Sequence, residues 1–112
     1  MSKYHSLKTT IDGITFDSKA EAERYAELKL LERGKVITDL TLQPEFELIP
    51  AFKKNGKTYR KTTYRADFMY FDVEKGKYVI EDVKGYLTDI FKLKRKLFEF
   101  KYPQYEIKEE HR

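Results

Sequence analysis

The sequence predicts one mixed α/β (α+β) domain whose elements follow the order helix, three strands, helix, strand. Helix start and stop signals bound two segments, residues 18–33 before Gly34 and residues 88–102 before Pro103. Between them, residues 40–84 contain aromatic and β-branched runs separated by turn residues, which is typical of paired strands. A chain of 112 residues can bury one modest core but not two, so we expect a single domain over residues 1–112.

The N-terminal elements begin with a small hairpin over residues 9–16, which turns at Asp12-Gly13. The first helix begins at Ser18 and ends near Arg33. Residues 40–49 alternate as one strand, and Pro44 within it predicts a sheet edge or a bulge.

The remaining elements are bounded by turns. Asn55-Gly56 is a tight-turn signal before a long strand that ends at Phe71, and residues 72–77 form the turn into a third strand. Residues 105–108 predict a short final strand. The second helix carries an apolar stripe at helical spacing, made of Ile90, Leu93, Leu97 and Phe100.

The composition is that of a folded globule, because 40% hydrophobic and 15% aromatic residues accompany the 38% that are charged. No stretch approaches the ~20 apolar residues of a membrane span, and the first residues lack the apolar segment of a signal peptide. The chain has no cysteine, which excludes disulfides and zinc–thiolate sites. We therefore expect a cytoplasmic protein.

The net charge of +4 is unevenly distributed. Basic residues interleaved with aromatic ones favour a polyanionic partner such as nucleic acid. For the helix lysines, a merely solubilising surface is an equally good interpretation. The residues expected to bind DNA are Lys53, Lys54, Arg60, Lys61 and Arg65 before and within the long strand, and Lys92 and Lys96 on the second helix.

Two carboxylates and a lysine on neighbouring strands are the most informative feature. If Phe71 pairs with Tyr78, the numbers of each antiparallel pair sum to 149, and Asp67 faces Asp82. Lys84 follows Asp82 by two positions and shares its face. Carboxylates directly opposite each other repel, and a divalent cation would offset that repulsion. Two acids with an ammonium group beside them suit metal-assisted cleavage of a phosphodiester.

Two alternatives to this interpretation stay open. A register slip of one residue would place Glu81 opposite Asp67 in place of Asp82. Asp82 and Lys84 could also form an ordinary solvated ion pair on a surface hairpin.

Glu21 also has two interpretations. Ser18 and Glu21 fit a capping box, in which each side chain bonds the backbone of the other residue. Glu21 also shares a helical stripe with Tyr25 and Leu28, the stripe expected to face the sheet. A carboxylate there could complete a site with Asp67 and Asp82.

The element order and the residues Glu21, Asp67 and Asp82-Val83-Lys84-Gly85 resemble the PD-(D/E)xK nuclease superfamily. More closely, the chain is similar to a family of short phage and prophage proteins related to Holliday-junction resolvases. The matching stretches are residues 16–23, 42–48, 64–68 and 81–85. Two departures are Ala66, where a proline can precede the acid, and Asp82, where glutamate is commoner.

The resemblance implies a restriction-endonuclease-like core of order αβββαβ, with a central mixed sheet flanked by helices. It implies a Mg²⁺-dependent endodeoxyribonuclease, with Mn²⁺ as an alternative ion. Asp67, Asp82 and the Val83 carbonyl would hold the metal, and Glu21 would bind a second ion or its water. Lys84 would orient the attacking water or stabilise the transition state. Gln43 and Glu81 are further residues that could contact the site.

By the same resemblance, the substrate is four-way or other branched DNA, and the protein acts in DNA recombination inside a bacterial host. Two symmetric cuts need two active sites, so we expect a homodimer. One alternative is a nuclease of other specificity, such as a nickase, a flap or single-strand cutter, or a DNA-packaging accessory. Another is a non-catalytic DNA-binding module on the same fold.

Overall fold

The structure is a computed structural model that describes residues 8–84 and 87–112, with only the backbone described at Lys84. Its two helices are α1 (Lys19–Arg33) and α2 (Asp89–Lys101). Its strands are β1 (Thr9–Ile11), β2 (Ile14–Phe16), β3 (Ile37–Leu42), β4 (Glu45–Ile49), β5 (Phe52–Lys54), β6 (Lys57–Tyr59), β7 (Thr62–Arg65), β8 (Phe68–Asp72), β9 (Lys77–Lys84) and β10 (Glu106–His111).

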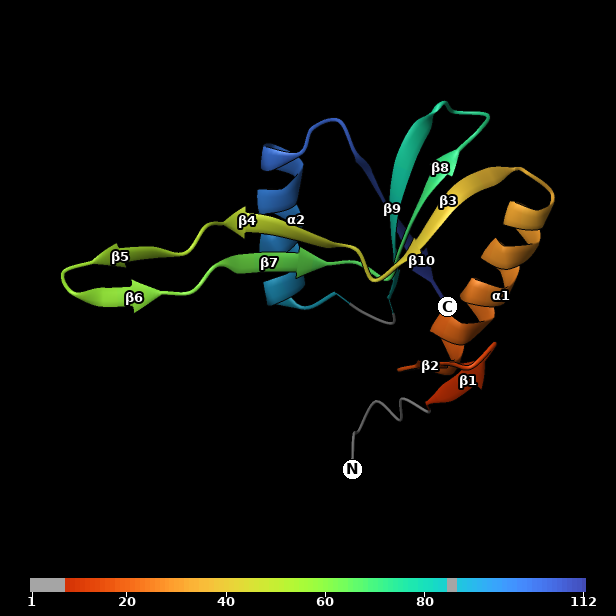
Figure 1. Ribbon diagram of the computed structural model, residues 1–112, viewed down its shortest axis with the longest axis horizontal. Helices are drawn as coiled ribbons and strands as arrows, with labels where there is room; N and C mark the ends of the chain where they lie inside the picture. The colour runs from red at the N-terminus through yellow and green to blue at the C-terminus, as the bar shows by residue number, and fades with distance from the viewer. Residues whose placement is uncertain (1–7, 85–86) are drawn as a thin grey trace.

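The central sheet has four strands in the order β10-β9-β8-β3. β3 and β8 pair antiparallel, as do β8 and β9, whereas β9 and β10 are parallel. The sheet is therefore mixed, and together with the two helices it confirms the predicted mixed α/β class. Figure 1 shows α1 beside this sheet and α2 behind β4 and β7.

Alternate residues of β8 and β9 bury two separate clusters, one on each face of the central sheet, because successive side chains of a strand point to opposite faces. Phe68, Tyr70 and Val79 pack with Tyr25 and Leu28 of α1. On the other face, Ile80 of β9 packs with a cluster that includes Leu48, Tyr64, Phe91 and Phe98. Each face of β9 is thus covered by a different helix.

The local signals for α1 and for the first hairpin are confirmed. The Ser18 hydroxyl accepts a hydrogen bond from the Glu21 backbone N–H at 3.1 Å, and the helix ends at Gly34. β1 and β2 pair across the turn at Asp12-Gly13, whose φ angles are 53° and 76°. These two positive φ values match the type I′ turn that Asp-Gly favours.

The predicted single strand over residues 40–49 is wrong, as is the long strand ending at Phe71. The first is divided into β3 and β4, which pair with β8 and β7 in different sheets. The second is divided into β6, β7 and β8. Pro44 lacks the N–H that a ladder needs, so the chain bends there and leaves one sheet for the other. The alternation of apolar residues in the sequence does not reveal that the two halves pair with different strands.

Of the apolar stripe predicted for the second helix, only Leu97 contacts the core, where it is partly buried. Phe91 and Phe98 are the buried residues, whereas Ile90, Leu93 and Phe100 are exposed, Phe100 by 88%. Both sets repeat at helical spacing, and the set whose two rings pack at a tilt against the ring of Tyr64 is the one inside. The helix bounds themselves agree with the prediction, since Thr88 caps the start and Tyr102 the end.

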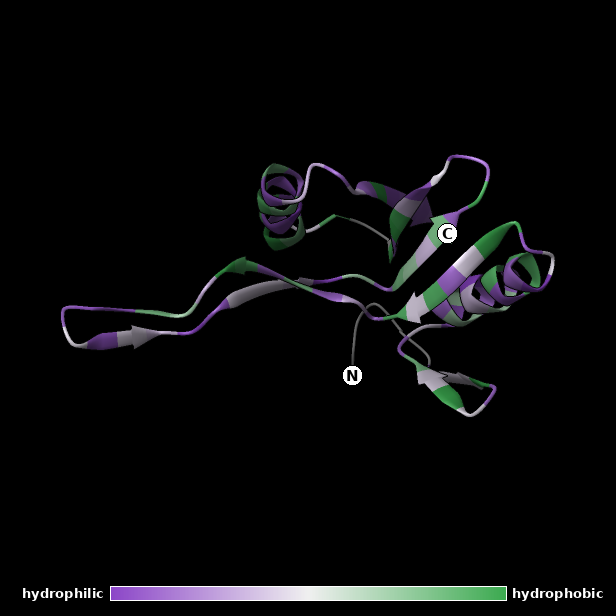
Figure 2. Cartoon of the chain, turned by 45° about the horizontal axis from the view of Figure 1, so that its top comes forward, coloured by the Kyte–Doolittle hydropathy of each residue, from purple (hydrophilic) through white to green (hydrophobic). Residues whose placement is uncertain are grey.

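A long two-stranded arm extends from the domain (Figure 1). Its base is β4 paired with β7, and its outer part is β5 paired with β6. Figure 2 shows the same extension from a second direction. The radius of gyration is 15.9 Å, above the roughly 13 Å typical of a compact domain of this length. The extended arm contributes to this excess. None of the helices in the described ranges is both long and apolar enough to cross a membrane.

Candidate functional site at the end of β8 and β9

The candidate site lies where the chain passes from the central sheet into the arm. The Gln43 N–H donates to the Asp67 carbonyl at 2.9 Å, and the Ala66 N–H donates to the Pro44 carbonyl at 3.1 Å. These bonds hold two bends side by side, one between β3 and β4 and the other between β7 and β8. Asp67 therefore occupies a fixed corner, and the exposed residue Gln43 is adjacent to it through the backbone.

The register between β8 and β9 agrees with the prediction. Phe71 pairs with Tyr78 and Phe68 with Glu81, so each pair sums to 149. Asp67 lies one position before β8, and its N–H donates to the Glu81 carbonyl at 3.2 Å. The slipped register, with Glu81 opposite Asp67, is absent from this part of the chain.

Hydrogen bonds join Asp67 and Asp82. The Asp67 N–H donates to Oδ1 of Asp82 at 3.2 Å, and the Val83 N–H donates to Oδ2 of Asp67 at 2.8 Å. The Tyr64 hydroxyl donates to Oδ2 of Asp82. Asp82 is only 1% exposed. These donors stabilise the two carboxylates, so the protein itself compensates part of the repulsion that we expected a cation to compensate.

Tyr64 is the residue at this site that sequence reasoning missed. Burial, together with the neighbouring charge of Asp82 and the hydrogen bond to it, raises the pKa of the Tyr64 phenol far above its ordinary value. The hydroxyl therefore stays protonated and remains a donor to Asp82. Tyr64 and Asp82 belong to strands of different sheets, and their contact has no local sequence signal.

The oxygen donors available here fit Mg²⁺. The Val83 N–H points toward Asp67, and in a strand the carbonyl of the same residue faces the same edge, so it lies on the Asp67 side. Two carboxylates and one carbonyl suit an ion that keeps several waters and also binds substrate phosphate. Within residues 8–84 and 87–112, however, no group of three ligating side chains comes together.

Glu21 is buried on the α1 stripe with Tyr25 and Leu28, as predicted. The capping half of its predicted role is present, because Ser18 accepts from its backbone. Among the described side chains, Glu21 does not form a three-ligand cluster with Asp67 and Asp82. Lys84 ends β9 opposite His111, and its side chain lies outside the described part of the structure.

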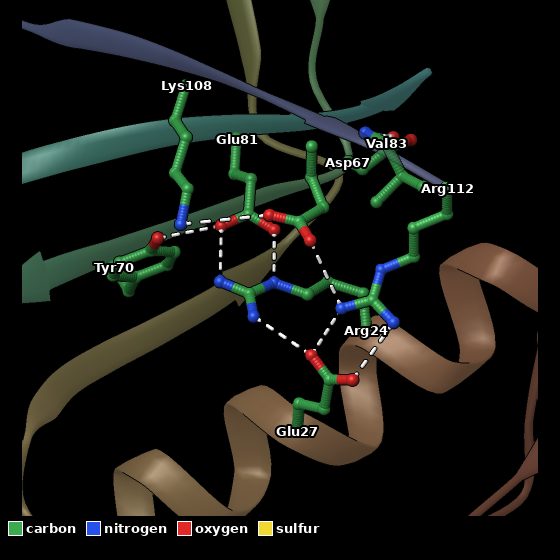
Figure 3. A network of polar contacts seen from close by, with 9 residues as sticks. Arg24, Glu27, Asp67, Tyr70, Glu81, Val83, Lys108 and Arg112 are labelled. Carbon is green, nitrogen blue, oxygen red and sulfur yellow. Dashed lines mark hydrogen bonds and ion pairs between the residues drawn. The ribbon is translucent and has the colours of Figure 1, made fainter. Parts of the chain in front are cut away.

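Glu81, the neighbour of Asp82, faces α1 and has a different environment. Its two carboxylate oxygens accept from Nε and Nη2 of Arg24 at 2.6 and 2.9 Å, and from the Tyr70 hydroxyl at 2.7 Å. Arg24 also donates to Glu27, which in turn binds Arg112 (Figure 3). Glu81 therefore has a structural role as the buried, bidentate partner of Arg24.

All seven basic residues predicted to bind DNA are exposed. Arg65 at the base of the arm and Lys94 of α2 line one pocket of about 410 Å³, which also reaches Tyr64. A second pocket of about 390 Å³ is lined by Lys92, Arg95 and Lys96. The first pocket places cationic side chains beside the tyrosine that bonds Asp82.

Comparison with known families identifies one match. The family described as "Protein of unknown function (DUF1064)" matches residues 1–111, so the chain belongs to this family. Comparison with curated proteins gives no match. Comparison with solved structures gives no match either.

Proposed function

We propose that this protein is a Mg²⁺-dependent DNA endonuclease of the PD-(D/E)xK type, acting on Holliday junctions or related branched DNA. The observation that carries the proposal is the joining of Asp67 and Asp82 by backbone hydrogen bonds at the ends of β8 and β9. Two acids side by side at such a corner, with Lys84 two positions after Asp82, are a costly arrangement for a purely structural role.

The order of the central elements also supports the proposal. The four strands of the mixed sheet and the two helices follow one another as α1, β3, β8, β9, α2, β10. This succession supports the αβββαβ order that the resemblance to a restriction-endonuclease-like core implies, if the first hairpin and the arm are taken as additions to that core. In that core, the acids come from the second and third strands of the sheet, which here are β8 and β9.

Each residue then has a proposed task. Asp67, Asp82 and the Val83 carbonyl would hold Mg²⁺ or Mn²⁺, and Tyr64 keeps the Asp82 carboxylate in place. The bound ion would supply Lewis-acid stabilisation of the phosphate charge. Glu21 and Lys84 keep the tasks that the resemblance implies, as a further acidic ligand and as the cation beside the reacting phosphate.

The basic surface supports DNA as the substrate. Arg65 and Lys94, with one acid, Glu45, line the pocket that reaches Tyr64, so a phosphate bound there would lie beside the tyrosine that bonds Asp82. Lys92 and Lys96 add positive charge along α2. Because a four-way junction is cut twice, symmetrically, we propose that the active form is a homodimer.

One observation favours a second candidate, a DNA-binding module without activity. The described residues hold two neighbouring carboxylates but no third ligating side chain grouped with them. Such a module would bind branched DNA through the same basic surface and would not respond to Mg²⁺.

Cleavage assays distinguish the candidates. Labelled four-way junction, linear duplex, nicked duplex and single strand are incubated with Mg²⁺ or with a chelator. Paired cuts near the branch point that need Mg²⁺ and vanish in Asp67→Asn support the proposal. Asp72→Asn, at the opposite end of β8, is the matched control and should cleave normally. Binding without cleavage by the unmodified protein would favour the second candidate, and full activity of Asp67→Asn would refute the site.

A further inference from the structure

The contacts of the outer arm, formed by β5 and β6, give it no role in stabilising the rest of the fold. β5 and β6 pair only with each other, through Phe52 with Tyr59, Lys53 with Thr58, and Lys54 with Lys57. Among the described elements, neither strand packs against a helix or a further strand. All residues from 51 to 61 are exposed. An isolated hairpin is at best marginally stable, so the connection to β4 and β7 is what holds this one.

The charge on the outer part of the arm is of one sign. Residues 48–66 contain six cations and no acid: Lys53, Lys54, Lys57, Arg60, Lys61 and Arg65. Lys61 lies 4.0 Å from Glu45 at the base. The ion pairs found in the described ranges include none of Lys53, Lys54, Lys57 or Arg60. A two-stranded ribbon with this charge is complementary to a polyanion, and a ribbon of this kind fits a DNA groove.

One face of the arm also carries aromatic rings. Phe52 and Tyr59 are directly opposite each other, with parallel rings whose centroids are 4.7 Å apart at an interplanar angle of 10°. They are 45% and 38% exposed. Lys54 and Lys57, two positions nearer the tip, share this face, and Nζ of Lys57 lies 4.9 Å from the centroid of the Tyr59 ring. The arm thus presents a stacked aromatic pair bordered by two ammonium groups.

The chemistry of this face indicates which part of a DNA molecule it fits. Exposed aromatic side chains stack on unpaired bases or act as wedges at base steps, while neighbouring lysines bind phosphates. Wedging into intact duplex requires breaking base stacking, whereas at a branch point the stacking is already interrupted. An aromatic pair among uncompensated cations therefore has more to gain at a branch than along a linear duplex.

We propose that the arm face formed by Phe52, Lys54, Lys57 and Tyr59 binds unstacked bases and their flanking phosphates at a DNA branch point. On this inference, the lysines contribute affinity for any DNA, and the aromatic pair provides the preference for branched over linear DNA. The inference deepens the proposed function and rests on DNA being the substrate, but it concerns recognition and not the acidic site.

The test compares binding of a labelled four-way junction and a linear duplex of matched sequence, with Ca²⁺ in place of Mg²⁺. The aromatic variant is Phe52→Ala with Tyr59→Ala, and the charge variant is Lys54→Gln with Lys57→Gln. Phe100→Ala removes a more exposed ring from α2, and Lys75→Ala removes a lysine from the turn between β8 and β9. These two are the matched controls. Sedimentation velocity follows the oligomeric state of each protein.

We expect the aromatic variant to lose junction affinity by about tenfold or more and to keep its duplex affinity, so that the preference for the junction falls. The charge variant should lose affinity for both DNAs and show a shallower salt dependence, by about 0.9 per lost phosphate contact on duplex. The control variants should match the unmodified protein. Because the arm lies outside both core clusters, thermal unfolding should be unchanged in all of them.

The outcomes separate this inference from the proposed function. An unchanged junction-to-duplex ratio in the aromatic variant, while the unmodified protein cleaves DNA with Mg²⁺, would overturn the inference and leave the function standing. An arm-dependent preference without any cleavage would support the inference and refute the nuclease proposal. A change in oligomeric state with an unchanged ratio would identify the arm as a protein contact and overturn the inference. Absence of all DNA binding would overturn both.

Discussion

Glu81 and Asp82 are neighbours in the sequence, and we predict that their substitution has opposite consequences. Glu81→Gln should lower stability strongly while the folded protein keeps its cleavage activity. Asp82→Asn should abolish cleavage at a small cost in stability. The reason is that the two side chains face opposite sides of the sheet, Glu81 toward Arg24 and Asp82 toward Tyr64.

The magnitude for Glu81 follows from its burial. Its side chain is 0% exposed and that of Arg24 is 10% exposed, and two short hydrogen bonds join them. Removing one partner of such a buried pair costs about 3–5 kcal/mol, because the remaining charge is left buried without compensation. Glu27, half-exposed, still contacts Arg24 at 3.0 Å, so we expect the lower end, about 3 kcal/mol. For 112 residues, this corresponds to a fall in Tm of roughly 13 °C.

Asp82→Asn keeps the shape and one acceptor oxygen for the Asp67 N–H or the Tyr64 hydroxyl. The loss should be about 1 kcal/mol, the typical net value of one hydrogen bond. The carboxylate charge is removed, however, and with it the proposed ability to hold Mg²⁺. This variant should therefore melt near the unmodified protein and show no Mg²⁺-dependent cleavage.

Thermal and urea unfolding, followed by circular dichroism, measure both effects, and cleavage is assayed well below the lower Tm. A third protein tests the physical reason for the Glu81 result. Replacing Arg24 and Glu81 with methionine, and Tyr70 with phenylalanine, removes the buried pair and the Tyr70 hydroxyl together, leaves Glu27 paired with Arg112, and should recover much of the lost stability. The reasoning is refuted if Glu81→Gln melts normally, or if it is fully folded yet inactive.

Three further predictions concern other parts of the molecule. Glu21→Gln should leave the Tm unchanged, because glutamine also serves in a capping box with Ser18, but should abolish Mg²⁺-dependent cleavage. Normal cleavage by this variant would show that Glu21 acts only as a helix cap. Burial and hydrogen bonds to carboxylates raise the pKa values of Tyr64 and Tyr70 above the ordinary value of 10.0. Above about pH 10 the unfolded state therefore binds fewer protons than the folded state, and the free energy of unfolding falls. A near-ultraviolet titration should show that both phenols ionise only when the protein unfolds. Lys96→Ala should reduce the salt slope of duplex binding by about one, and an unchanged slope would make this lysine a solubilising residue.

The parts of the fold that the sequence could predict are those with local causes. Ser18 and Gly34 bound α1, Thr88 and Tyr102 bound α2, and Asp12-Gly13 turns the first hairpin. Each of these is set by a cap or a turn whose chemistry lies within a few residues. The pairing of Phe71 with Tyr78, assumed from the turn residues between them, is confirmed in β8 and β9, because the length of a hairpin loop fixes which residues are opposite each other.

Other parts depended on partners far along the chain. Ile90 and Phe100 lie outside and Phe91 and Phe98 inside because of the surface that β4, β7 and β9 present to α2, and the helix sequence alone contains two usable stripes. The division of residues 40–49 into β3 and β4 depends on which strand each half pairs with. Alternation reports which residues share a face of a strand, but not which neighbouring strand they pair with.

The same limit explains the candidate site. The sequence favours Asp82 as the partner of Asp67 but leaves a slip to Glu81 open, because both are acids at the end of one strand. The choice is made by Arg24, which is 57 residues away in sequence and binds Glu81 on the α1 face. Because Glu81 is paired with Arg24 on that face, the acid that lies beside Asp67 is Asp82. A substitution of Arg24 should therefore lower the stability of the fold, but Arg24 takes no part in the proposed reaction. Its effect on cleavage should disappear when the assay is run well below the Tm of the variant.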